Sequence, residues 1–339
     1  MNVPLVPAAT LAGPEQADSG LARYVVSEAV WAPSVHNTQP WWFNAGPDGL
    51  CLYADQGRQL TAADPGGREM LLSCGAAVFT ARLALRAAGW VPGVQVLPDP
   101  AQPLLVARLT WQHRAVPARF ERRLAAQVRQ RRTHRGGFDP LPLAPQLIAE
   151  LVEGAARYGA VLQVVTDEGI RAALAEVVRE AEQALELDGA RARERAVWTT
   201  PPGSLRGDGV PPHAYPARAE RTFPYFPAPG FARGRGWGRP PLSTLPGRSA
   251  GTVCVLATRS DEPADWVGAG QALQRILLTS AAYGVAAALH SQPFQLGRSR
   301  GLVGLRPGLY PHLILRLGVT TQAAAGVRRP PGSVLAETT

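Results

Sequence analysis

Residues 68–89 read REMLLSCGAAVFTARLALRAAG, and residues 268–284 read GAGQALQRILLTSAAYG. In both stretches the apolar side chains recur at the spacing of an α-helix. Gly75 and Gly89 in the first stretch have the same spacing as Gly270 and Gly284 in the second. Each stretch also has an internal arginine and an alanine pair near its end. Two alanine-rich helices can resemble each other by chance, so the match needs support from a second element.

A second match follows each of these helices. Residues 103–109 read PLLVARL and residues 311–317 read PHLILRL, and both short apolar runs are typical of buried strands. Because helix and strand recur in the same order, we interpret the chain as an internal duplication of two α+β halves. We expect a loose N-terminal arm at 1–20, a first half over 21–125 and a second half over 126–339.

Composition is that of a globular protein. Hydrophobic residues make up 46% of the 339 residues, enough for a sizeable core. No apolar run reaches the roughly 18 residues of a membrane span, and the N-terminus lacks the features of a signal peptide. Three widely spaced cysteines, Cys51, Cys74 and Cys254, favour reduced thiols over a disulfide framework or a zinc site. We therefore expect a cytoplasmic protein with no membrane partner.

The chain is basic, with a formal net charge of +9. Nucleic-acid binding is one interpretation, and it would require a continuous basic groove and strongly salt-dependent binding. However, every basic residue is an arginine, and a GC-rich genome explains this usage without any nucleic-acid partner. The absence of lysine excludes a lysine Schiff base and a P-loop lysine, so any phosphate must be held by arginine and backbone amides.

Residues 201–247 differ from the rest of the chain. They hold 11 prolines and 8 glycines, a density that prevents regular structure. Disordered segments are poor in aromatic residues, whereas this one is rich in them. We interpret it as a lid, or as an arm that packs on a neighbour. Its aromatic residues are Tyr215, Phe223, Tyr225, Phe226, Phe231 and Trp237.

Two polar stretches are candidates for a binding site. In residues 33–40, PSVHNTQP, prolines stiffen a turn whose amide side chains can read the edge of a flat heteroaromatic ring; a capping turn before a buried tryptophan is the alternative. In residues 131–138, RRTHRGGF, guanidinium groups beside a hydroxyl suit a phosphate, although a solvated basic helix end is also possible. Arg328 and Arg329 form a second basic pair.

These stretches resemble known motifs. APSVHNTQPWWF at 32–43 is similar to the APSxxNxQPWxF segment of the FMN-binding nitroreductase superfamily, and RRTHRGGF is similar to its RRSxRxF segment. The two occur in reversed order, as in the Acg-type subgroup, whose single chain imitates a nitroreductase dimer. DPGGREMLLSCGAA at 64–77 and VRRPPG at 327–332 also resemble motifs of that subgroup. No GxGxxG turn of a Rossmann unit follows an early strand.

The resemblance implies a nitroreductase-like α+β fold of two fused halves, each with a mixed β-sheet flanked by helices. It implies one FMN between the halves, and a second FMN is not expected because the first half lacks an arginine segment. The arginine segments would hold the phosphate. The turn at residues 33–40, which leads into Trp41 and is here named the QPW turn, would line the ring. The segment after the second duplicated helix would lie near flavin N5. The implied FMN-binding residues are Pro33, Ser34, Asn37, Gln39, Arg131, Thr133, Arg135, His290, Ser291, Gln292, Arg328 and Arg329.

The implied activity is reduction of nitro, quinone or related acceptors by NAD(P)H through the flavin. The alternative is a protein that sequesters flavin, with residues 201–247 blocking nicotinamide access. An open face over the ring would favour the enzyme, whereas aromatic side chains filling that face would favour sequestration. The sequence leaves open whether the protein is a monomer or a homodimer.

Overall fold

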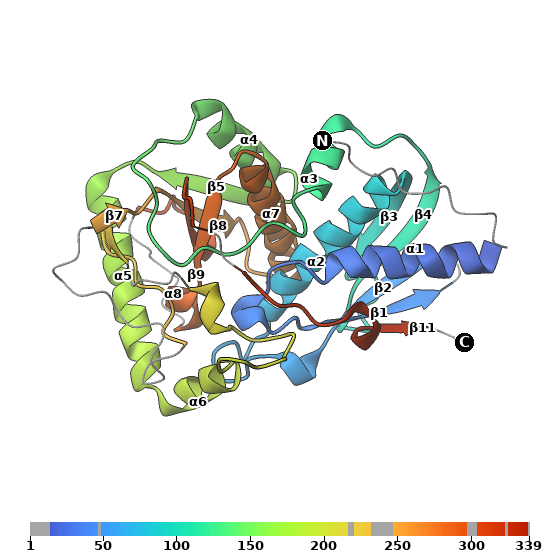
Figure 1. The fold of residues 1–339 in the computed structure, drawn as a ribbon, viewed down its shortest axis with the longest axis horizontal. Helices are drawn as coiled ribbons and strands as arrows, with labels where there is room; N and C mark the ends of the chain where they lie inside the picture. Colours follow the sequence, from blue (N-terminus) through green and yellow to red (C-terminus); the bar gives the residue numbers. More distant parts are fainter. Residues whose placement is uncertain are drawn as a thin grey trace.

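The computed structural model describes two β-sheets joined by a pair of central helices (Figure 1). The described residues are 14–46, 49–215, 220–231, 247–296, 304–322 and 325–337. The first sheet has the strand order β11-β1-β2-β4-β3, with β1 (Trp41–Gly46), β2 (Gly49–Ala54), β3 (Trp90–Val96), β4 (Leu105–Arg114) and β11 (Leu335–Glu337). The second has the order β5-β8-β10-β9, with β5 (Ala160–Val165), β8 (Thr252–Thr258), β9 (Ala286–His290) and β10 (Tyr310–Gly318).

The two sheets repeat one topology. The order β1-β2-β4-β3 corresponds strand for strand to β5-β8-β10-β9, and every one of these pairings is antiparallel. Internal duplication predicts this correspondence, and the α+β class is confirmed. The first sheet is mixed because β11 adds in parallel to β1, with Leu335 opposite Phe43. The second sheet is antiparallel in its described strands, not mixed as expected, because the single C-terminal strand pairs with the first sheet.

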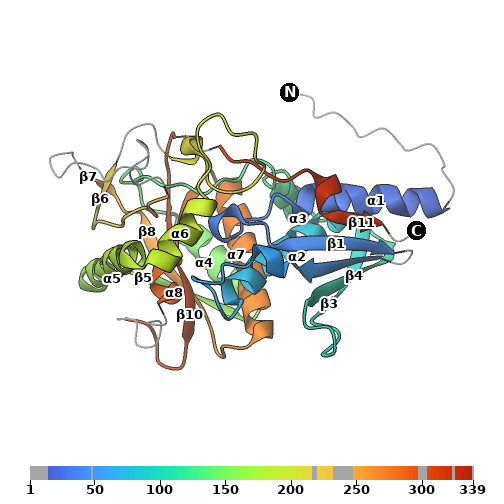
Figure 2. The same ribbon diagram turned by 90° about the horizontal axis from the view of Figure 1, so that it is seen from below.

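Two long helices pack against each other between the sheets, as Figure 2 shows from a second direction. They are α2 (Arg68–Ala87) and α7 (Pro263–Ala282), the helices that the repeated sequence predicted. Gly75 and Gly270 lie where the two backbones meet, and a side chain at either glycine would collide with the opposite helix. α2 is long and apolar enough to cross a membrane, but 78% of its most apolar window is buried in the fold, so its apolar character is accounted for by the core.

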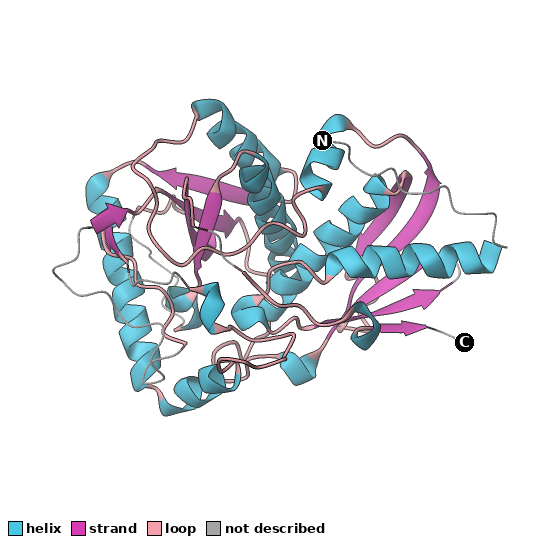
Figure 3. Ribbon diagram, in the orientation of Figure 1, coloured by secondary structure: helices cyan, strands magenta, loops and turns pink. Residues whose placement is uncertain are grey.

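Alternate residues of β8 contact helices on opposite faces of the second sheet. Cys254 and Leu256 pack with the helix at 145–156 and with α7, whereas Val253 and Val255 pack with the helix at 168–187. This alternation is expected of a strand buried on both faces. Figure 3 shows the helices around both sheets. The remaining helices are α1 (Pro14–Ala29), α3 (Arg119–Ala125), α4 (Pro145–Ala156), α5 (Glu168–Leu187), α6 (Gly189–Val197) and α8 (Gln292–Gln295), with short 3₁₀ turns η1 (Val35–Asn37), η2 (Gln56–Arg58), η3 (Pro212–Ala214) and η4 (Pro331–Ser333).

The polypeptide crosses between the sheets twice near the candidate motifs. The segment after α3 pairs with β9 of the second sheet, where His134 N–H donates to Ala287 O, and then with the short strand at 247–249, where Phe138 N–H donates to Ser249 O. The C-terminal segment returns to the first sheet as β11 (Figure 1). Helix α1 begins at Pro14, within the stretch expected to be a loose arm, and residues 1–13 lie outside the described residues. The boundary between the halves at 125/126 stays a prediction.

The stretch expected to be a lid or arm is irregular in its described parts, apart from η3 and a short parallel pair. That pair joins β6 (Arg221–Phe223) to β7 (Gly247–Ser249). Residues 216–219 and 232–246, which include Trp237, lie outside the described residues.

Candidate functional site

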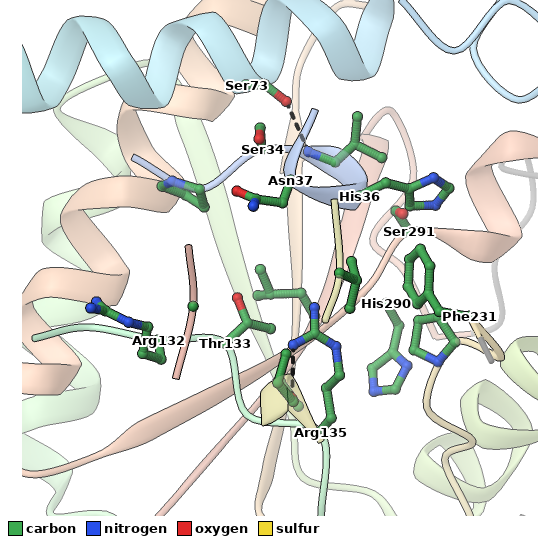
Figure 4. A pocket seen from close by; sticks show the side chains of 18 of the residues that line it. Ser34, His36, Asn37, Ser73, Arg132, Thr133, Arg135, Phe231, His290 and Ser291 are labelled. Atoms are coloured by element: carbon green, nitrogen blue, oxygen red, sulfur yellow. Dashed lines mark hydrogen bonds between the residues drawn. The ribbon is translucent and has the colours of Figure 1, made fainter. Parts of the chain in front are cut away.

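A pocket opens where the two crossing segments, the QPW turn and the second sheet meet (Figure 4). Ser34, His36 and Asn37 lie on one side of it, and Thr133 and Arg135 lie opposite them. Other lining residues come from the start of α2, from the end of β9 with α8, from β10, from 209–214 and 228–231, and from 325–328. The pocket is therefore built from segments far apart in the sequence, including the two motifs that resemble nitroreductase segments.

The QPW turn has an unusual backbone. His36, Asn37 and Gln39 have φ values of 47°, 55° and 50°, in the left-handed region that non-glycine residues seldom occupy. Hydrogen bonds hold this conformation: Ser34 Oγ accepts from Gln39 N–H at 2.9 Å, and Ser73 Oγ accepts from Val35 N–H at 3.2 Å. The turn is thus fixed both internally and by helix α2.

The structure separates the predicted residues of this turn. Pro33, Ser34 and Asn37 line the pocket, whereas Gln39 does not. The Gln39 side chain is fully buried behind the turn, where its Nε2 donates to Gly207 O at 2.8 Å. Its amide is therefore engaged by protein backbone, and a direct contact of Gln39 with a ring in this pocket stays an untested prediction.

Arginine side chains gather at one end of the pocket. Arg131, Arg132, Arg135 and Arg328 all line it, and among the described residues none of them forms an ion pair with a carboxylate. Arg131 is buried, and its Nε and Nη1 have no hydrogen-bond partner in the described part of the chain. Burial, and then the neighbouring arginines, lowers the pKa of Arg131 to about 10 and that of Arg328 well below its ordinary value. The described residues supply this arginine cluster with no paired negative charge, which an anionic ligand would supply.

Arg328 and Arg329 face different ways. Arg328 reaches the pocket and lies over the Trp31 ring, 5.6 Å from its centroid. Arg329 lies outside the pocket lining, and its Nη2 donates to Ser333 O at 3.0 Å. Thr133 lies beside the cluster and bridges to Ala287 of β9.

At another part of the pocket wall, β9 ends at His290, Ser291 follows and Gln292 begins α8; all three were predicted and all three line the pocket. Gln292 is buried, yet neither its Nε2 nor its Oε1 has a hydrogen-bond partner among the described residues. A buried amide with a free donor and a free acceptor suits a ligand that offers both in one plane.

His290 is paired with a buried arginine that we did not predict. Arg316 of β10 donates from Nε to His290 Nε2 at 2.9 Å, so Nδ1 of the neutral imidazole carries the proton. Arg316 is held by Ala250 O and Gly136 O, with the Phe138 and Phe226 rings each 5.4 Å away. Burial, and then Arg316, lowers the pKa of His290 well below its ordinary value. The pair therefore adds to the site the positive charge of Arg316 and the Nδ1–H of His290, which has no hydrogen-bond partner within the described ranges.

Two further lining residues, Glu69 and His36, were also missed. Glu69 is buried, and burial followed by Asp64 raises its pKa to about 7; Gln295 Nε2 donates to its Oε2 at 3.0 Å, while its Oε1 has no hydrogen-bond partner among the described residues. His36 packs edge-on against Phe231, with ring centroids 4.8 Å apart. Burial lowers the pKa of His36 to about 3, so it is neutral. Glu69 lies in the DPGGRE stretch quoted above, which was the available signal.

The comparisons with known proteins bear on the family. No family model matches the chain. Over 308 residues it is 34% identical to "Putative NAD(P)H nitroreductase Rv3131" of Mycobacterium tuberculosis (strain ATCC 25618 / H37Rv), covering 89% of this chain and 86% of that protein. The chain belongs to the nitroreductase family. This member is also 29% identical over 308 residues to "Putative NAD(P)H nitroreductase acg" of the same strain, covering 88% and 89% of the two chains, which confirms the Acg-type relationship.

Solved structures resemble this family member less closely. The NADPH:FMN oxidoreductase from Vibrio harveyi, complexed with NAD+, shares 13% identity with a TM-score of 0.37, covering 64% of this chain and 77% of that one. A nitroreductase with bound FMN from Bacteroides fragilis NCTC 9343 shares 13% identity with a TM-score of 0.35, covering 61% and 93%.

Proposed function

We propose that this chain binds one FMN in the pocket and works as an NAD(P)H-dependent oxidoreductase of nitroreductase type. The observation that carries the proposal is an arginine cluster that has no carboxylate partner in the described part of the chain, in the same pocket as a buried amide whose two polar atoms have no partner there. Phosphate and a heteroaromatic ring with alternating donors and acceptors are the two groups that these features fit. FMN contains both.

The phosphate would be held by Arg131, Arg135 and Arg328, with the Thr133 hydroxyl as a further donor. Guanidinium groups bind phosphate through paired, charge-assisted hydrogen bonds, and binding would relieve the repulsion within the cluster. Arg135 is already oriented, because its Nη1 donates to Ala214 O at 3.1 Å. Arg329 has no phosphate contact in this proposal, since its side chain lies behind the pocket wall.

The ring would be oriented by Gln292 and His290, with Ser34 and Asn37 on the opposing wall. When bound, FMN supplies the transfer of hydride or single electrons. The protein residues position the ring, exclude water and set the local charge. Arg316 brings a fixed positive charge, and Glu69 can hold a proton near neutral pH on a carboxyl that lines the pocket.

The proposed acceptors are nitro compounds and quinones. Support comes from the printed names of the relatives, which are NAD(P)H nitroreductases. The pocket wall beside the turn offers Phe231 and the neutral His36, which suit a flat, uncharged ring better than a charged acceptor. We propose either NADH or NADPH as the reductant.

A second candidate function is flavin sequestration. The observation that favours it is that Val210, Ala214 and Phe231, all buried and all from the stretch 201–247, line the pocket and pack on one another. If these residues cover the ring, nicotinamide cannot reach it, although a small reductant can.

One anaerobic experiment separates the two functions. The FMN-loaded protein is mixed with NADH or NADPH, and the flavin absorbance is followed before and after adding menadione or nitrofurazone. The proposed oxidoreductase is bleached by at least one nicotinamide and recovers its colour with an acceptor. Bleaching by dithionite but by neither nicotinamide would favour sequestration. A protein that retains no FMN would contradict both.

A further inference from the structure

The QPW turn performs a task beyond lining the pocket. We propose that Gln39 and Asn37 are positioning residues that couple two segments: the lid loop, defined as residues 207–211, and the arginine arm, defined as residues 327–329. Through this coupling, capture of an anion at Arg328 and closure of the lid loop become one event. The inference rests on the proposed function only in naming FMN as the anion.

Gln39 contacts both segments with one amide. Its Oε1 accepts from the N–H of Arg329 at 2.9 Å, and its Nε2 donates to Gly207 O at 2.8 Å. Both partners are backbone groups with fixed hydrogen-bonding roles, so the orientation of the amide is unambiguous. The backbone O of Gln39 adds a weaker contact at 3.4 Å from Arg329 Nη1. Gln39 therefore joins the arm to the loop through opposite ends of a single side chain.

Asn37 makes a parallel connection. Its Nδ2 donates to Gly209 O at 2.9 Å and to Val327 O at 3.2 Å, while its backbone O accepts from Gly209 N–H at 3.2 Å. Asn37 and Gln39 both hold left-handed backbone conformations, and a strained turn of this kind persists only where its surroundings determine it. The two amides are thus aimed at the same pair of segments from one rigid turn.

The lid loop and the arginine arm also touch directly. A side chain at Gly207 would place its Cβ 2.6 Å from Arg328 O, so the two backbones are in contact. On its other side the loop is tied to the first half, where Arg58 Nη1 and Nη2 each donate to Asp208 Oδ2 at 3.0 Å. Arg58 Nη1 also donates to Thr38 O at 2.7 Å, so Arg58 connects Asp208 of the lid loop to the backbone of the QPW turn.

A thermodynamic consequence follows from these contacts. An anion held by Arg328 fixes the arginine arm, and the arm fixes the lid loop through Gln39, Asn37 and Gly207. Because coupling between two sites is reciprocal, a closed lid loop must in turn raise the affinity for the anion. Val210 and Pro211 of the loop line the pocket, so closure changes the space available above a bound ligand.

The test is Gln39→Glu, which keeps the size of the side chain and the acceptor for Arg329 N–H but removes the donor to Gly207 O. Hydrogen exchange of the full-length protein is measured by mass spectrometry over peptides that cover 205–211, with and without saturating FMN. In the wild type we expect FMN to slow exchange of this segment by about fivefold or more, the lower end of typical coupling. In Gln39→Glu with FMN still bound, we expect most of that slowing to disappear.

The matched control is Gln59→Glu. Gln59 also donates from Nε2 to two backbone carbonyls, Asp64 O at 2.8 Å and Pro65 O at 3.1 Å, but among the described residues its side chain has no hydrogen bond to the lid loop or the arm. This variant should keep the wild-type protection at 205–211. Asn37→Asp, which removes the donor to Gly209 O and Val327 O, is the second test variant, and we expect it to behave like Gln39→Glu.

Three outcomes would overturn the proposal: wild-type protection in FMN-bound Gln39→Glu or Asn37→Asp, an equal loss in Gln59→Glu, or no protection of 205–211 in the FMN-saturated wild type. The last outcome needs no variant and decides the matter even if both variants fail to fold. If the wild type binds no FMN, the proposed function fails, and inorganic phosphate is used as the anion. Protection of 205–211 by phosphate would still support the coupling, and its absence would refute it.

Discussion

Gly75 of α2 and Gly270 of α7 make the same contact from opposite sides. A Cβ added at Gly75 would lie 2.2 Å from Val267 O, and one added at Gly270 would lie 1.9 Å from Leu72 O. Leu72 precedes Gly75 by the same number of residues as Val267 precedes Gly270. The two helices therefore cross about a local twofold axis, as two copies of one element would.

We predict that Gly75→Ala and Gly270→Ala each destabilise the fold by about 1–3 kcal/mol or more, because a methyl group must push two helix backbones apart. Gly20→Ala in α1 is the control, since no atom lies within 4 Å of its added Cβ and alanine favours a helix over glycine. Urea unfolding followed by circular dichroism measures all three. A neutral effect at Gly75 and Gly270 would mean that the helices are not in backbone contact.

The duplicated core was predictable because its signals are local. Helical spacing and the glycine pairs marked α2 and α7, and the matching apolar runs marked β4 and β10. The parallel addition of β11 to β1 was not predictable, since it joins residues near opposite ends of the chain. Helix α3 ends at Ala125, and the following turns lead into the arginine segment.

We predict that removing one arginine of the cluster raises the stability of the FMN-free protein and lowers its affinity for FMN. Arg131→Met removes a buried charge whose Nε and Nη1 are unpartnered in the described structure, so we expect the FMN-free protein to gain thermal stability. The same change removes a charge-assisted phosphate contact and should weaken FMN binding by about 10- to 150-fold, or 1.5–3 kcal/mol.

Differential scanning calorimetry without FMN and fluorescence titration with FMN measure the two effects. The exposed Arg119, changed to alanine, is the control for general charge and should alter neither quantity much. Equal weakening of FMN binding by both substitutions would show that overall charge, not this cluster, attracts the cofactor.

We predict that the stability of the fold depends on pH through the Glu69 carboxyl. Its folded pKa of about 7 lies above the ordinary 4.5, mainly because of burial and then because of Asp64, with Arg68 and hydrogen bonds from Gln295 and Ser291 opposing the shift. The folded state holds the proton more tightly, so this group's contribution to stability is full below pH 4.5 and is lost as the pH rises through 7.

Glu69→Gln keeps an acceptor for Gln295 Nε2 and cannot titrate. We therefore expect the stability of the variant relative to the wild type to increase between pH 4.5 and 7, with a slope approaching about 1.4 kcal/mol per pH unit. Chemical denaturation across this range provides the curves. Parallel curves for the two proteins would exclude Glu69 as the proton-holding group.

We predict that Phe231 limits the access of reductants to the bound flavin. Phe231→Ala removes a buried ring that lines the pocket and packs on His36, so we expect faster reduction of bound flavin by dithionite and by NAD(P)H. Leu205→Ala is the control within the same stretch, because Leu205 is fully exposed. Stopped-flow absorbance gives the rates, and unchanged rates in Phe231→Ala would indicate that this part of the chain is a spacer.

The pocket-lining residues that belong to a recognisable motif could be predicted from the sequence. Arg131, Thr133 and Arg135 meet the QPW turn in one pocket, as the motifs implied. The position of Gln39 was not predictable, since its partners Gly207 and Arg329 come from distant segments whose approach only the tertiary fold determines.

Buried charge was the other feature that the sequence concealed. Arg316 stands in the apolar run PHLILRL and was interpreted only as part of a buried strand, although it lines the pocket. No local pattern distinguishes a strand arginine that reaches a pocket from one that reaches solvent. His36 and Glu69 were also missed, because burial and not sequence spacing sets their charge states, although Glu69 stands in the quoted DPGGRE stretch.

The stoichiometry and identity of the flavin test the central claim most directly. Purified protein saturated with FMN and freed of excess by gel filtration is acid-denatured, and the released flavin is identified and counted by chromatography against the protein concentration. We expect one FMN per chain, because one arginine cluster meets one QPW turn in the described structure. Two flavins per chain, FAD in place of FMN, or no flavin retained would contradict it.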